Sequence, residues 1–372
     1  MRLPLTAELD RPLGRLGVLA GTGGALAAAA AAIVFAGVLD LVLGSSEHEI
    51  VILFGINAVL VVGLQAFVGN TGIMSFGHVA FMGLGAYTAG IFTVPVVEKT
   101  IFLAGLPGFL RGTTLPIVIA VVVGGLVALV CGLVVGPLIV RLPEATASIV
   151  TFALLVVMNN VFQNATSFTR GNQTFIGVPQ SATFSLVFGF LAAAVALTAT
   201  LKWSALGLRA RAVREDAVSA EASGIRVSTA RYWPFALSAF VTGIGGALWA
   251  LDVTAFSSNS FYLTQSIGAI AMMILGGYRS VTGGIVGATV MSVWLELVRH
   301  VENGVTLASV HVRPLPGLSQ LFLGLAIVLV LRWRPAGLVG ARELQLRLAR
   351  RPKEAPEPES PGDVPRAASA GG

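Results

Sequence analysis

Ser75 and His78 lie three residues apart in the stretch GNTGIMSFGHVAFMGLGAYTAG, which runs from Gly69 to Gly90. On a helix this spacing puts both side chains on one face, where an imidazole could act as base for a serine nucleophile. A serine hydrolase also needs an orienting acid and an oxyanion hole, and no acid lies near this pair in the sequence. The pattern therefore favours two polar residues that satisfy each other inside a packed bundle.

Motifs for nucleotide, metal or redox chemistry are absent from the sequence. It contains no G-x-x-x-x-G-K-[ST] phosphate loop, no H-E-x-x-H and no Cys/His cluster with metal-ligand spacing. Its one cysteine, Cys131, excludes an intrachain disulfide and argues against redox chemistry. We therefore expect a chain that is not an enzyme and holds no cofactor.

The composition of the chain indicates which kind of secondary structure holds these residues. Hydrophobic residues make up 55% of the 372, charged residues only 11%, and the mean hydropathy is +0.85; soluble domains carry about 25% charged residues. Long apolar stretches recur, each long enough for the roughly 20 residues that cross a bilayer as a helix. The sequence predicts an all-α polytopic membrane protein with about ten transmembrane helices, at 17–43, 50–68, 72–93, 114–139, 146–162, 183–202, 233–251, 262–277, 281–299 and 317–331.

Basic residues in the short loops predict the orientation. With the N-terminus in the cytoplasm, the Lys and Arg residues that fall outside are Lys99, Arg111, Arg170, Arg299 and Arg313, and the others fall inside. The positive-inside rule therefore favours N-in/C-in. The net charge of +6 lies at the ends of apolar segments rather than on one soluble face, which argues against nucleic-acid binding and for contact with the bilayer.

The same pattern divides the chain into three parts. Residues 1–16 form a cytoplasmic N-terminal segment, residues 17–331 form the transmembrane domain, and residues 332–372 form a basic juxtamembrane segment followed by a Pro- and Glu-rich tail. We expect that tail to be disordered. The one long cytoplasmic loop inside the transmembrane domain spans 203–232.

Small apolar residues in that loop recur at helical spacing and form one stripe: Leu206, Ala210, Val213, Ala217 and Ala220. The charged residues Arg211, Arg214, Glu215 and Asp216 stand off the stripe, and Gly224 would end the helix as a left-handed cap. A stripe of small residues suits a shallow groove on a partner protein. A surface helix lying among lipid headgroups is the alternative.

Acidic residues near helix ends are the remaining candidates for function. Asp252 and Glu296 lie near the predicted outer ends of their helices rather than at mid-depth. Glu296 can reach Arg299 or His300 one turn away, so an interfacial ion pair and an outer gate or docking contact are both open. Because mid-membrane charges mark ion coupling, their absence argues against an ion-driven carrier or channel.

The glycine-rich stretch divides into two halves. Small residues spaced four apart, Gly85 with Ala89 and Ala86 with Gly90, predict close helix approach, and Gly83 belongs to the same packing surface. Upstream, Gly69–Gly77 falls where one predicted helix hands over to the next. Discontinuous helices expose polar groups to a transport pathway, so the residues with a candidate pathway role are Thr71, Ser75 and His78.

Four motifs together resemble one known family. The glycine-rich stretch, SALGLRARAVREDAVSAEASGI, MILGGYRSVTGGIVGA and LFLGLAIVLVLRWRPAGLVG occur in the order and spacing of the branched-chain amino acid permeases of ABC importers. The resemblance covers roughly Gly55 to Gly340. It implies a multi-pass permease of the bacterial inner membrane.

The resemblance also implies partners and roles. Such a permease pairs with a second, similar permease, two cytoplasmic ATPase subunits that carry ATP and Mg, and an extracytoplasmic solute-binding protein. The loop helix would dock into an ATPase groove, and the residues implied in coupling are Arg211, Arg214, Glu215, Asp216, Ala220 and Gly224.

Departures from the family wording leave the solute open. In the late glycine motif, Tyr278-Arg279-Ser280 stands where family members commonly have Gly-Leu or Gly-Ser. The loop TRGNQTFIGVP, which is predicted to lie outside, only loosely resembles the glycine-rich loop of the family. The resemblance implies branched-chain or related hydrophobic amino acids. Urea, short amides and other small organic solutes are alternatives, because the same kind of permease also serves them.

Overall fold

The computed structural model describes residues 48–302 throughout, residues 22–37 with gaps, and short pieces between 306 and 340. Apart from one short strand pair, every regular element in this part is helical. The elements are α2 (His48–Thr71), α3 (His78–Thr93), α4 (Val96–Phe102), α5 (Gly108–Arg111), α6 (Ile117–Ile139), α7 (Glu144–Asn164), α8 (Thr166–Thr169), α9 (Phe184–Trp203), α10 (Ala205–Glu215), α11 (Ala217–Ala222), α12 (Val227–Val253), the 3-10 turn η1 (Ser258–Phe261), α13 (Leu263–Gly276), α14 (Val281–Glu302), β1 (Thr306–Leu307) and β2 (Val310–His311).

Five helices are long and apolar enough to cross a membrane: α2, α6, α7, α9 and α12. Two bent pairs, α3 with α4 and η1–α13 with α14, pass the same test when each pair counts as one span, which raises the total to seven. The predicted crossings 17–43 and 317–331 are described only in part, and the segment 1–16 and most of the tail 332–372 lie outside the described residues. An all-helical membrane protein is therefore confirmed, while ten crossings and the N-in/C-in orientation stay predictions.

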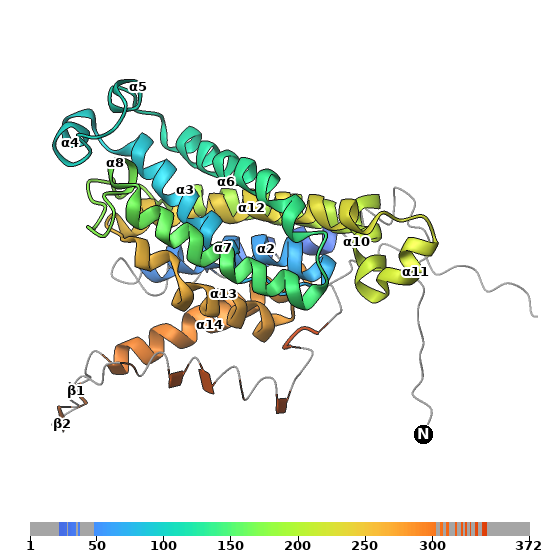
Figure 1. Ribbon diagram of the computed structural model, residues 1–372. Coiled ribbons are helices and arrows are strands. Elements are labelled where there is room, and N and C mark those ends of the chain that lie inside the picture. The colour runs from blue at the N-terminus through green and yellow to red at the C-terminus, as the bar shows by residue number, and fades with distance from the viewer. Residues whose placement is uncertain are drawn as a thin grey trace, which may run out of the picture.

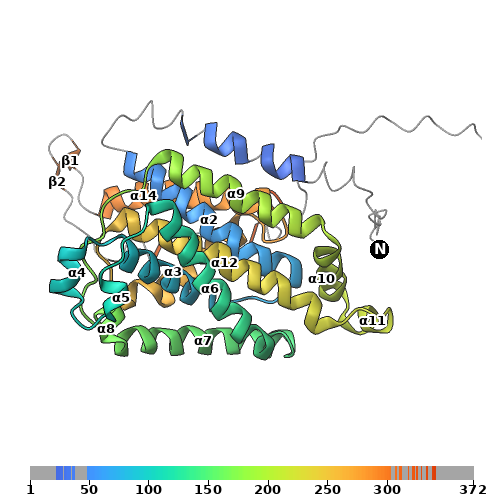
Figure 2. The same cartoon turned by 90° about the horizontal axis from the view of Figure 1, so that it is seen from above.

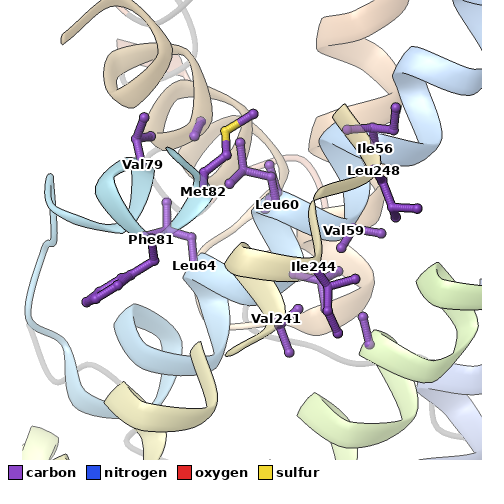
Figure 3. Close-up of a cluster of buried hydrophobic side chains, with 14 of the residues drawn as sticks. Ile56, Val59, Leu60, Leu64, Val79, Phe81, Met82, Val241, Ile244 and Leu248 are labelled. Carbon is purple, nitrogen blue, oxygen red and sulfur yellow. The ribbon is translucent and has the colours of Figure 1, made fainter. Parts of the chain in front are cut away.

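Two helices form the centre of the bundle. In their most apolar windows, α2 is 89% and α12 is 83% buried, against 33–39% for α6, α7 and α9. Figures 1 and 2 show α2 and α12 side by side, with α6, α7 and α9 around them. Apolar side chains from α2, α3 and α12 meet between them (Figure 3), among them Leu60, Met82 and Ile244. The outer helices keep apolar faces exposed, as lipid contact requires.

The predicted crossings at 262–277 and 281–299 are joined by a sharp bend. Helix α14 is bent by 118° relative to η1–α13. Helix α13 ends at Gly276, and the next residue, Gly277, has a φ of 116°, which favours glycine. With 14 residues, α13 is about 21 Å long, which is short of a hydrocarbon core of roughly 30 Å. The pair forms a hairpin in which α13 does not cross by itself.

The loops of the bundle gather at two opposite ends. One end, which we call the α10 end, holds α10 and α11 together with the inner loops around Gly69, Arg141 and Arg279; the other holds α4, α5 and α8 (Figures 1 and 2). At the α10 end Arg231 donates a hydrogen bond to the Leu142 carbonyl at 3.1 Å. Loops predicted on one side of the membrane therefore come together in space.

Candidate functional site: a cavity, a polar pair and a charged loop

The Ser75–His78 pair is enclosed by aromatic rings. His78 Nδ1 lies 2.6 Å from Ser75 Oγ, and both residues are buried. The imidazole stacks on Phe67 with ring centroids 5.5 Å apart, and the edges of Phe81 and Phe235 cover it. No carboxylate contacts the pair, and the described residues hold no group of His, Cys, Asp and Glu suited to a metal ion. The arrangement gives a packed polar pair rather than a nucleophile and its base.

Thr71 lies in the same interior. Its hydroxyl donates to the Phe67 carbonyl one turn back at 2.9 Å, and the side chain is fully buried. Helix α2 ends there, because Gly72 takes a φ of 77° and the chain stays non-helical until α3 begins at His78. The helix break is where the sequence predicts it, and a pathway role for these residues stays a prediction.

Glycines in α3 bring three helices together. A Cβ added at Gly85 would lie 1.9 Å from the Gly243 carbonyl oxygen of α12, and one added at Gly90 would lie 2.8 Å from the Phe175 ring. At Gly83 the added carbon would lie 2.6 Å from the Phe162 ring. Ala86 and Ala89 are fully buried beside them. Real side chains do not fit at such distances, so α3 depends on Gly85 for its contact with α12 and on Gly83 and Gly90 for its contacts with the Phe162 and Phe175 rings.

A cavity of about 720 Å³ brings together Asp252 and Glu296, the two acids that the sequence singled out. It lies between the first half of α2, the end of α12, the start of α13 and the second half of α14. Glu49 contributes a third carboxylate to its lining. Because the side chains of Arg299 and His300 lie outside the described residues, the predicted ion pair of Glu296 stays a prediction.

The lining of the cavity combines acid groups with an apolar wall. Among the described residues, no Lys, Arg or His lines it. Leu53, Leu60 and Met272 supply apolar surface, and Asn57 donates a 3.2 Å hydrogen bond to Ser292 on the opposite wall. Such a cavity can hold a solute of amino-acid size that has a cationic group and an aliphatic body, because carboxylates attract the first and the wall contacts the second.

At the other end of the bundle, the loop 203–232, which the sequence predicts to be cytoplasmic, folds as two helices rather than one. The sequence predicts a single helix ending at Gly224, and this is wrong at Asp216, which takes an extended conformation with φ −156° and ψ 108°. Its carboxylate accepts hydrogen bonds from the backbone N–H of Val218 and Ser219 at 2.9 and 3.2 Å and so caps α11. Gly224 does end α11 with a φ of 82°.

The predicted apolar stripe packs against the chain itself. Val213 and Ala220 form a small buried cluster with Ala230 at the start of α12. Other side chains of α10 and α11 remain on the surface, notably Val218, which is 78% exposed. A partner on this face would therefore meet the surface around Val218 rather than the stripe. Ala220 lies in the small buried cluster, and Gly224 lies at the exposed end of the loop.

Charged residues of the loop contact two other segments. Glu215 Oε1 lies 2.7 Å from Arg214 Nη2 and 2.5 Å from Arg279 Nη2. Arg214 also donates to the Gly69 carbonyl, and Arg211 stacks over the Trp203 ring at 5.2 Å. The loop is thus tied to the break between α2 and α3 and to the bend between α13 and α14.

Hydrogen bonds lower the pKa of Glu215 and Asp216. The pKa of Glu215 is held below its usual range, first by the hydrogen bond from Arg214 and then by the charges of Arg214 and Arg279. The pKa of Asp216 is lowered mainly by the Ser219 hydroxyl, which donates at 2.5 Å. Both carboxylates are therefore ionised at neutral pH and available to arginine partners.

Several residues at these sites were not predicted from the sequence. Glu49, Asn57 and Ser292 line the cavity from helices far apart in the chain, and no spacing rule connects them. Arg279 is notable in the sequence only as a departure from family wording. Its ion pair with Glu215, 64 positions away, appears only in three dimensions.

Comparison with known proteins identifies the family. The pattern described as "Branched-chain amino acid transport system / permease component" matches residues 48–331, which is most of the chain. The chain belongs to this family. It is thus a multi-pass membrane permease of the bacterial ABC importer family, and it is a permease component rather than a catalytic subunit.

Individual relatives are distant. The chain is 26% identical over 334 residues to the high-affinity branched-chain amino acid transport system permease protein LivM of Escherichia coli (strain K12), with 81% of this chain and 71% of that protein covered. Its Salmonella typhimurium counterpart is 26% identical over 78% and 69%. The nucleoside ABC transporter permease protein NupC of Lactococcus lactis is 35% identical over 95 residues, covering 25% of this chain and 30% of that protein. No solved structure matches the chain.

Proposed function

We propose that this permease forms part of the translocation pathway of an ABC importer for branched-chain or related hydrophobic amino acids. The cavity carries the proposal for the solute. Its three carboxylates, Glu49, Asp252 and Glu296, face an aliphatic wall. A group of this kind matches an ammonium group next to a branched side chain. Urea and short amides lack the cationic group that these carboxylates attract.

The proposal extends to the partner subunits of this permease, which its family and the α10–α11 loop support. We propose a second, similar permease, two ATPase subunits that bind ATP and Mg, and an extracytoplasmic binding protein. The sequence has no phosphate loop of its own, and α10–α11 presents exposed Val218 beside the charged Arg214–Glu215 pair. An exposed apolar residue within a charged rim is typical of a protein interface.

The cavity position suggests how solute arrives. Asp252 and Glu296 lie at the end of the bundle away from α10 and α11, which is the predicted outer end. We propose that the carboxylates receive the solute after the binding protein releases it, so that the predicted gate or docking role and solute contact belong to one place. Thr71, Ser75 and His78 line no part of this cavity.

The test is solute uptake by the complete importer. The chain is co-expressed with the permease, ATPase and binding-protein genes adjacent to its own and reconstituted in proteoliposomes. ATP-dependent uptake of leucine, isoleucine or valine supports the proposal, and uptake of urea or an amide with no amino-acid uptake contradicts the solute. Asp252→Asn should raise the KM for the amino acid about tenfold, as expected for one lost charge contact, whereas Glu221→Gln at the opposite end should not.

ATPase docking is tested separately. The double variant Glu215→Ala and Asp216→Ala should reduce co-purification of the ATPase subunits and transport while the protein still inserts in the membrane. Unchanged co-purification and unchanged transport in this variant would remove the coupling role from these residues.

A further inference from the structure

At the α10 end of the bundle three segments far apart in sequence meet at one point. They are the break after α2 at Gly69–Gly72, the end of α10 at Arg214–Glu215, and the bend between α13 and α14 at Tyr278–Arg279. A Cβ at Gly69 would lie 2.6 Å from the Tyr278 carbonyl oxygen, and one at Gly72 would lie 2.8 Å from Arg214 Cγ. Both glycines thus leave the space that the other two segments occupy. We call this meeting point the inner junction.

Arg279 carries two of the links at the inner junction. Its guanidinium pairs with Glu215 at 2.5 Å, and its backbone carbonyl accepts a 2.6 Å hydrogen bond from Lys202 Nζ at the end of α9. The Arg279 side chain is 40% exposed, whereas Arg214 on the other side of Glu215 is only 13% exposed. Glu215 therefore joins an arginine fixed in the interior to one at the bend.

Arg279 lies in the bend between α13 and α14, and both of these helices line the cavity. Helix α13 lines it with Thr264, Gln265 and Met272, and α14 lines it with Ser292 and Glu296. The two helices are packed backbone to backbone, since a Cβ at Gly276 would lie 1.8 Å from the Gly283 carbonyl and one at Gly287 would lie 2.0 Å from the Met272 carbonyl. Close packing of this kind makes the pair move as one body rather than as two independent helices.

We propose that Arg279 is a positioning residue that transmits displacement of α10 to the α13–α14 hairpin and so to the cavity. The proposal rests on the proposed function, because the displacement comes from the ATPase that docks on α10–α11. A pull on α10 moves Glu215, the ion pair carries Arg279 with it, and the paired helices shift the acid-lined end.

The experiment uses the complete importer in proteoliposomes, with Arg279→Gln, Arg279→Lys and the control Arg141→Gln. Arg141 is exposed at the same end and makes no ion pair within the described part of the chain. Uptake per ATP hydrolysed should fall about two- to fivefold in Arg279→Gln, the size expected for one partly exposed ion pair. Arg279→Lys should restore it, and Arg141→Gln should leave it unchanged.

A distance measurement separates transmission from a merely structural role. Spin labels are placed at Ile50 and Thr264, which line the cavity from α2 and α13, in a Cys131→Ser background. A nucleotide-dependent change of the distance between the labels should be present with Arg279 and reduced in Arg279→Gln. If Arg279→Gln does not yield a folded complex, Glu215→Gln removes the same pair and takes its place, with ATPase co-purification measured alongside to exclude a loss of docking.

The outcomes separate this proposal from the proposed function. An importer that assembles and transports with the same uptake per ATP and the same distance change in Arg279→Gln overturns the role of Arg279 and leaves the function standing. A wild-type complex that binds no ATPase, or hydrolyses ATP without moving any amino acid, overturns the function itself.

Discussion

The crossing of α3 with α12 and the hairpin of α13 with α14 are packed in the same way but have different surroundings. In both, a glycine lies against a carbonyl of the other helix: Gly85 against Gly243 and Gly246 against Met82 in the first, Gly276 against Gly283 in the second. Other helices and aromatic rings surround the α3–α12 crossing. The hairpin borders the acid-lined cavity at one end and the charged inner junction at the other.

The polar residues beside the α3–α12 crossing also differ in their surroundings from those beside the α13–α14 hairpin. Beside the α3–α12 crossing, Ser75 and His78 bond each other, lie among aromatic rings and do not line the acid-lined cavity. Beside the hairpin, Asp252 and Glu296 face open space. A polar residue within a membrane bundle is therefore a stronger candidate for solute contact when it lines a cavity than when it is packed away from one.

The largest effect that separates the two regions is expected from Gly85→Leu. The new side chain would meet the Gly243 carbonyl within 1.9 Å, and we expect a loss of at least about 3 kcal/mol of stability, the upper end for overpacking. Thermal unfolding of the purified protein in detergent measures it. Gly189→Leu is the control, because nothing lies within 4 Å of a Cβ there; equal stability of the two variants would mean that the α3–α12 contact is not close.

Gly268→Leu is expected to separate stability from transport. Gly268 lines the cavity and has nothing within 4 Å of an added Cβ, so the leucine should enter open space and leave the unfolding temperature near wild type. Filling the cavity should lower amino-acid uptake at least about tenfold, as a misfitted apolar group does in a binding pocket. Uptake at the wild-type rate would show that solute does not use this cavity.

Ser75→Ala should affect stability alone. It leaves His78 without its 2.6 Å partner in an enclosed site, which costs about 1–3 kcal/mol for a buried polar group. Uptake per folded molecule should stay at the wild-type value. A variant of normal stability with impaired uptake would show that this pair takes part in transport rather than in packing alone.

The smallest effect is a pH dependence of the inner junction. Because the pKa of Glu215 is lowered in the folded protein by Arg214 and Arg279, its pairs stabilise the junction above the ordinary glutamate pKa of about 4.3. That contribution is lost as pH falls through the lowered folded value, and it is below about 1 kcal/mol for such exposed pairs. Stability measured between pH 6 and about 3 should fall less in Glu215→Gln than in the wild type; parallel curves would mean that Glu215 is unpaired.

Sequence determined the class of this protein through composition and local spacing. Apolar length predicts spanning helices whatever their neighbours, and small residues four apart predict close approach because they share one helix face. The break after α2 could be predicted for the same reason, since Gly72 favours a positive φ by itself.

Tertiary structure decided what those elements do together. The loop stripe of Val213 and Ala220 predicts an apolar face, but only the fold showed that α12 covers it. Asp252, Glu296 and Glu49 become one site because three helices converge, and Arg279 finds Glu215 across 64 positions. Pairings of this kind depend on the directions of whole helices, which no local pattern encodes.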